Sequence, residues 1–284
     1  MWSLGGLSWR ELVKRTWHEV WEDEVFGQAA RLAFYHFLAI FPCLLLLLFL
    51  LANFAAAEVR LRDTLVACLA SLLPQQSSDL MQSMIAQLRD TAHSGTGAWS
   101  AGLGGAWAAF NGTWAVMSGL NIAYEVKEQR PLWKLIPIAF ALTVSLALLF
   151  LISLALLVCA VQRLPGNALR WLQWPILGVL LLVSFALLYR FGPNLNDRRW
   201  QWSTPGAAVG LALWLIAAGL MRFYSVHFHS YALIYKQLNG AATLLLWFYF
   251  TSAAVLIGGE MNSEIEKAAR EKRSGAQPRP REGS

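Results

Sequence analysis

The sequence predicts an all-α, polytopic membrane protein with six transmembrane helices, and three observations lead to that prediction. Of its 284 residues, 57% are hydrophobic and 14% are charged, whereas a soluble domain carries about 25% charged residues. Residues 241–259 form an uncharged run that, as a helix, crosses the roughly 30 Å hydrocarbon layer of a membrane. Other long apolar stretches precede this run. The predicted spans are residues 33–54, 99–123, 135–161, 174–191, 205–224 and 240–259.

The predicted transmembrane domain, residues 33–264, lies between two more polar segments. In the N-terminal segment, residues 1–32, apolar residues recur at helical spacing with basic residues between them, which predicts an amphipathic helix on the membrane surface. These apolar residues are Trp9, Leu12, Val13, Trp17 and Val20. The external loop, residues 55–98, carries leucines at helical spacing and predicts further amphipathic helices. The tail, residues 265–284, is charged and is predicted to be partly disordered.

The distribution of Lys and Arg predicts the orientation of the chain. Of the 23 basic residues, sixteen lie in the N-terminal segment, the second and fourth loops and the tail, and seven lie on the other side. The positive-inside rule therefore places both termini in the cytoplasm. The same rule accounts for the net charge of +6, so we expect membrane lipids, and not nucleic acid, as partners. The three cysteines lack the spacing of a metal site or a disulfide framework.

Polar residues cluster where the chain enters the first span. Gln28, Arg31 and Tyr35 fall on one helical face, and His36 lies beside them. Polar and ionisable groups at membrane depth usually face a bundle interior or a water-filled cavity, so these residues are candidates for the cytoplasmic mouth of a substrate path. The alternative is that Arg31 reaches the lipid headgroups while His36 makes one hydrogen bond between helices.

The second predicted span is rich in small residues and carries three polar ones, Asn111, Thr113 and Asn121. Such side chains are costly against lipid, so we expect them to bond neighbouring helices or to line a polar cavity. Small residues four apart let helix backbones approach closely. The predicted packing residues are Gly105, Ala109, Ala108, Gly112, Gly206, Gly210 and Gly258.

Glu260 and Asn262 close the last span. One hypothesis makes Glu260 a gate or a proton-coupled carboxylate. The other makes it an interfacial charge that pairs with an arginine and locks helix ends together. The arginines on the same predicted side are Arg31, Arg190 and Arg198.

Metal and cofactor signals are weak in this sequence. His227 and His229 are the nearest approach to a ligand pair, but no acidic residue lies close to them in sequence, and two interfacial histidines explain them as well. The chain has neither an HxHxDH run nor a phosphate-binding P-loop. We therefore expect no metal and no cofactor.

Four stretches together carry a family resemblance. They are residues 28–42 (QAARLAFYHFLAIFP), residues 107–134 with GLNIAYEVKEQRPLWK, residues 189–205 (YRFGPNLNDRRWQWSTP), and residues 225–264 with SYALIY and LWFYFTSAAVLIGGEMNSE. In this order they resemble the YihY/BrkB family of bacterial inner-membrane proteins, often labelled ribonuclease BN-like. The resemblance covers nearly the whole chain. It implies six helices, an inner-membrane location and an association with envelope integrity and lipid export.

Three functions follow from these observations. The leading hypothesis is movement of a lipid or other amphipathic envelope metabolite across or within the membrane. The first alternative is an envelope scaffold without transport activity, assembled as a homo-oligomer through Gly206 and Gly210. The second alternative is the ribonuclease of the family label, which we judge doubtful because the sequence has no metal motif. We therefore predict a protein that is not an enzyme.

Overall fold

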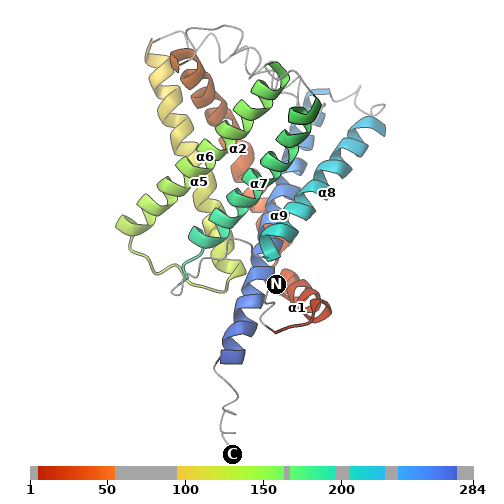
Figure 1. Ribbon diagram of the computed structural model, residues 1–284. Coiled ribbons are helices and arrows are strands. Elements are labelled where there is room, and N and C mark those ends of the chain that lie inside the picture. Colours follow the sequence, from red (N-terminus) through yellow and green to blue (C-terminus); the bar gives the residue numbers. More distant parts are fainter. Residues whose placement is uncertain (1–5, 55–94, 163–166, 196–204, 228–235, 274–284) are drawn as a thin grey trace, which may run out of the picture.

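The computed structural model describes residues 6–54, 95–162, 167–195, 205–227 and 236–273. Regular structure in these ranges is entirely α-helical, which confirms the predicted fold class. The helices are α1 (Trp9–Glu22), α2 (Val25–Phe54), α5 (Gly95–Ala123), α6 (Leu132–Gln162), α7 (Asn167–Phe191), α8 (Pro205–His227) and α9 (Lys236–Arg273) (Figure 1). Most of the external loop and residues 274–284 of the tail lie outside the described residues, so the predictions for them stay predictions.

Four of the described helices are long and apolar enough to cross a membrane. The qualifying segments are Leu132–Ser153, Leu172–Phe191, Pro205–Phe223 and Gly240–Lys272. The chain is therefore a multi-pass membrane protein, while a membrane crossing by α2 and α5 remains a prediction. The last helix continues to Arg273, beyond the predicted span end at residue 259, because the Glu, Lys, Ala and Arg residues that follow are good helix formers.

The last helix, α9, is the centre of the bundle. It packs against α8, α2, α1 and α5. Its residues Val255 and Leu256 are buried together with Leu32 of α2, Leu120 of α5 and Phe185 of α7. In contrast α6, which the sequence predicts as an almost wholly aliphatic span, leaves many large apolar side chains exposed, among them Phe140 and Leu148. Helices α2 and α5 to α9 form one bundle, with α1 beside the C-terminal half of α9 (Figure 1).

Glycines allow α8 and α9 to touch through their backbones. A β-carbon added to Gly206 or Gly258 would overlap the carbonyl oxygen of the other residue, and one on Gly210 would lie 3.1 Å from the Ala254 carbonyl oxygen. Asn262 reinforces the contact, since its Oδ1 accepts a hydrogen bond of 3.0 Å from the backbone N–H of Gly206. These glycines make close contacts within one chain, and a homo-oligomer through Gly206 and Gly210 stays a prediction.

The amphipathic helix α1 has two apolar faces instead of the single one expected from the sequence. Its N-cap is Ser8, whose hydroxyl accepts a hydrogen bond from the backbone N–H of Glu11. Leu12 and Val20 are buried, and Leu12 packs with Met261 and Ile265 of α9. The other face is exposed and consists of Trp9, Val13, Trp17 and Trp21. The first face is buried in the folded protein, and the second remains available to a membrane surface.

Candidate functional site

A groove of about 560 Å³ lies between α2 and α5. One side of it carries Gln28, Arg31 and Tyr35 from successive turns of α2, and Asn111 faces it from α5. Apolar and aromatic side chains make up much of the remaining wall. They include Leu32, Leu38, Ala39, Trp107, Ala108, Trp114 and Ala115. The groove therefore combines one permanent positive charge with amide, phenol and indole groups on an apolar background.

Two predicted path residues lie elsewhere in the bundle. The ring Nδ1 of His36 lies 3.4 Å from the Ser252 hydroxyl of α9, which matches the alternative of one hydrogen bond between helices. The Thr113 hydroxyl donates to the carbonyl of Ala109 on its own helix. Asn111 lines the groove, but its amide also donates to its own helix, to the carbonyl of Trp107. Asn111 therefore fits the alternative of lining a cavity, while the hydrogen bond of Thr113 stays within its own helix.

Asn121 belongs to a hydrogen-bond network at the end of α5. Its Nδ2 donates to the Glu128 carboxylate over 2.9 Å, and its Oδ1 accepts from the backbone N–H of Asn194 over 2.8 Å. Arg130 binds the same carboxylate and also donates to the carbonyl of Gly192. The Arg130 hydrogen bonds, aided by that of Asn121, lower the pKa of Glu128 to about 2. The network joins the α5–α6 loop to the end of α7.

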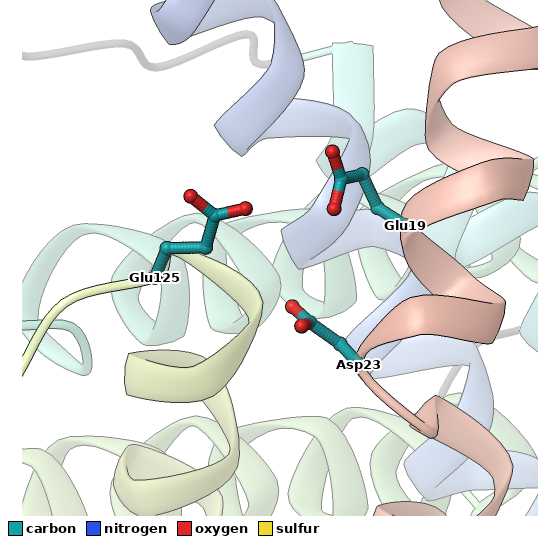
Figure 2. Close-up of side chains that lie close together, drawn as sticks. All are labelled: Glu19, Asp23 and Glu125. Carbon is teal, nitrogen blue, oxygen red and sulfur yellow. The ribbon is translucent and has the colours of Figure 1, made fainter.

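Three carboxylates, two at the end of α1 and one just after α5, lie close together. Oxygen atoms of Glu19, Asp23 and Glu125 all lie within 4.8 Å of one another (Figure 2). Glu19 and Asp23 are one helical turn apart at the end of α1, and Glu125 follows the last turn of α5. Glu125 adopts a left-handed backbone conformation, with φ of 49°, which turns the chain there.

The C-terminal half of α9 adds two acids and one base to this cluster. Lys267 Nζ lies 2.7 Å from Glu125, 2.8 Å from Glu264 and 3.5 Å from Glu19. Glu260 is fully buried, and its carboxyl group lies within hydrogen-bonding reach of Asp23. We call Glu19, Asp23, Glu125, Glu260, Glu264 and Lys267 the acidic cluster.

Burial and neighbouring like charges in the acidic cluster favour the neutral form of its carboxyl groups. Burial raises the pKa of Asp23, and the neighbouring charge of Glu125 adds to the increase. Burial also raises the pKa of Glu19, although Lys267 opposes that increase. Of the expected partners of Glu260, Arg31 lines the α2–α5 groove instead, and Arg198 lies outside the described residues. Glu260 faces other carboxylates instead of an arginine.

The chain matches a known protein family. The family model described as "Virulence factor BrkB" matches residues 16–283. The chain belongs to the BrkB family. This match confirms the resemblance found in the sequence. It covers the α2–α5 groove and every residue of the acidic cluster.

Curated BrkB relatives come from several bacteria. The chain is 26% identical over 255 residues to the "Putative ribonuclease-like protein YfkH" of Bacillus subtilis, covering 85% of this chain and 90% of the relative. It is 28% identical over 267 residues to a "UPF0761 membrane protein" of Vibrio campbellii, covering 89% and 80%. A similar protein of Rhodospirillum centenum is 27% identical over 248 residues, which is 86% of this chain and 55% of that one. No solved structure gives a significant match.

Sequence reasoning named Glu260 but missed the other members of the acidic cluster of this BrkB-family chain. Its members come from α1, the end of α5 and α9, so no local motif unites them. The available signal was the four-residue spacing of Glu19 and Asp23 in a chain with few charges. Of the proposed histidine pair, His227 ends α8 and His229 lies outside the described residues.

Proposed function

We propose that this protein moves a lipid or another amphipathic envelope metabolite across or within the bacterial inner membrane, with both termini in the cytoplasm. The α2–α5 groove is the observation that carries the proposal. An amphipathic molecule needs a polar end for its headgroup and an apolar surface for its chain. The groove offers Arg31 and Asn111 for the first and Leu38 and Trp107 for the second.

The chemistry of the groove favours an anionic headgroup. Arg31 is exposed, always charged, and able to bind phosphate or carboxylate through two parallel hydrogen bonds. Tyr35 and Trp107 are 46% and 68% exposed, so they present large amphipathic surfaces at the groove instead of filling the core. The volume of about 560 Å³ is typical of sites that hold a small-molecule ligand.

The groove separates this proposal from its alternatives. A scaffold needs a closed bundle in which polar groups are paired, and an open groove with an exposed arginine does not serve that purpose. A ribonuclease needs an acid–base pair or a metal beside bound RNA. The words "ribonuclease-like" belong to the printed name of the Bacillus relative, and the groove itself has no acidic side chain.

A translocation assay tests the proposal. Purified protein is reconstituted in liposomes that carry a fluorescent anionic phospholipid, and dithionite bleaches the label in the outer leaflet. We expect the protein to expose inner-leaflet label faster than empty liposomes do. Arg31→Gln and Trp107→Ala should slow this several-fold, while Arg222→Gln, at an exposed arginine of α8 outside the groove, should not. Well-folded protein without any translocation would contradict the phospholipid version and favour the scaffold.

A further inference from the structure

The acidic cluster has more negative charge than its own residues neutralise. Its five carboxyl groups, from Glu19, Asp23, Glu125, Glu260 and Glu264, surround a single ammonium group, that of Lys267. Lys267 makes its two short contacts with Glu125 and Glu264. Among the described residues, Asp23 and Glu260, which interact with each other, are therefore left without a direct cationic partner.

Glu260 is the decisive residue because it is buried and its carboxyl group interacts with that of Asp23. It is 1% exposed, and its Oε1 has no hydrogen-bond partner among the described residues. Asp23 Oδ2 is also buried and unpartnered. A buried carboxylate oxygen without a donor is costly, so the site needs a proton or a cation that the chain does not supply.

The dimensions of the cluster fit a cation held by oxygen atoms. Ligands on opposite sides of a calcium ion, each about 2.4 Å from it, lie about 4.8 Å apart, and those around magnesium lie about 4.2 Å apart. The oxygens of Glu19, Asp23 and Glu125 lie within 4.8 Å of one another. Three carboxylates at this spacing match the ligands that hard divalent cations prefer.

We propose that Glu19, Asp23 and Glu125 bind one divalent cation of the magnesium, calcium or manganese class, with the buried carboxyl group of Glu260 beside Asp23. The site joins the end of α1 to the end of α5 and to α9 (Figure 2). Glu125 has a side chain 52% exposed, so the site opens to solvent on that side and water can complete the coordination. Lys267 borders the site and competes with the cation for Glu19 and Glu125.

A shared proton between Asp23 and Glu260 is the rival explanation. One proton removes one negative charge and leaves Glu19 and Glu125 competing for Lys267. A divalent cation offsets two charges and contacts the carboxylates at the ends of α1 and α5 together. The two explanations differ in a direct observable, because only the second predicts saturable metal binding.

Manganese binding to the full-length protein in detergent tests the proposal. The protein is stripped with EDTA and dialysed, and Mn²⁺ is titrated while the electron paramagnetic resonance of the free ion is measured. We expect one bound Mn²⁺ per chain, displaced by Mg²⁺ or Ca²⁺. Asp23→Asn and Glu260→Gln should weaken binding about tenfold or more, because the first removes a ligand charge and the second removes a buried negative charge beside Asp23. The control Glu22→Gln changes an exposed acid on α1 and should bind as the natural chain does.

A variant with higher expected affinity separates the loss of a ligand from the loss of the fold. Lys267→Gln removes the competing ammonium group and should tighten Mn²⁺ binding, a result that unfolding does not produce. Absence of stoichiometric Mn²⁺ binding by the natural chain would overturn the proposal in favour of the shared proton. Equal affinities for the natural chain, Asp23→Asn and Glu260→Gln, or no tightening in Lys267→Gln, would overturn it as well. The outcome is independent of the translocation assay, since Arg31 and Trp107 take no part.

Discussion

Gly258 of α9 faces Gly206 of α8 so closely that a β-carbon on Gly258 would lie 2.6 Å from the carbonyl oxygen of Gly206. Between helices in lipid, association depends on van der Waals packing and hydrogen bonds, because the lipid tails are as apolar as the side chains. Two facing glycines maximise that packing. The α8–α9 contact is therefore the part of the bundle that tolerates added volume least.

Gly258→Ala should destabilise the protein strongly. The new methyl group would also meet the Tyr189 hydroxyl, so α7 and α9 would have to separate or Tyr189 would have to move. Overpacking of this kind costs about 1–3 kcal/mol or more. The measurement is the apparent Tm in detergent. Gly219→Ala is the matched control, because nothing lies within 4 Å of a β-carbon there, and it should leave the Tm unchanged or raise it.

Tyr189→Phe should lower the stability by a smaller amount. The buried Tyr189 hydroxyl donates a hydrogen bond of 2.8 Å to the carbonyl of Val255. Its loss should cost about 0.5–1.5 kcal/mol. The apparent Tm of the variant is compared with that of Tyr35→Phe, which changes an exposed tyrosine. Equal effects of the two substitutions would contradict a specific α7–α9 bond.

Glu128→Gln should make stability less dependent on acid pH. The pKa of Glu128 is lowered from 4.5 to about 2 in the folded protein, so its carboxylate stabilises the fold above pH 4.5 and this contribution is lost as the pH falls toward 2. Replacement by Gln should cost about 1–3 kcal/mol at neutral pH, because the hydrogen bonds from Arg130 are charge-assisted. Apparent Tm values at pH 7 and pH 3 provide the test. A gap between variant and natural chain that does not shrink at pH 3 would speak against this assignment.

Leu12→Ala should detach α1 from the bundle. Leu12 is completely buried against Met261 and Ile265, and truncating a buried leucine costs about 2–5 kcal/mol. We expect faster backbone hydrogen exchange throughout α1 with little change in α6. Val13→Ala removes a neighbouring side chain that is 44% exposed and should have a much smaller effect. Similar exchange in the two variants would mean that the exposed face, and not Leu12, holds α1 in place.

Features set by length and composition could be predicted from the sequence. The apolar run in α9 and the long helices α6, α7 and α8 follow from hydrophobicity alone, because a membrane-spanning helix needs a stretch of fixed length. The small residues Gly206, Gly210 and Gly258 were recognisable for the same kind of reason. Close backbone approach requires residues with small side chains or none, and such residues can be read directly from the sequence.

Features that depend on which helices meet could not be predicted. Helical spacing placed Gln28, Arg31 and Tyr35 on one face, and the structure confirms that they line the same groove. The spacing could not reveal that Thr113 bonds its own helix, because that depends on the side-chain rotamer. Nor could it bring Glu260 to Asp23, since only the docking of α1 on α9 joins them. Nor could the sequence predict which apolar face of α1 packs against α9, because both faces carry large apolar residues.

The docking of α1 on α9 also governs when the molecule can be completed. The contact between Lys267 and Glu19 joins residues 248 positions apart, at opposite ends of the described chain. During synthesis α1 leaves the ribosome first, and Met261 and Ile265 of α9, which receive Leu12, are translated much later. Until α9 has been made, the face of α1 that carries Leu12 lacks its packing partners. The docking of α1 therefore has to await the synthesis of α9, and a chain cut short before α9 would lack the residues that bury Leu12.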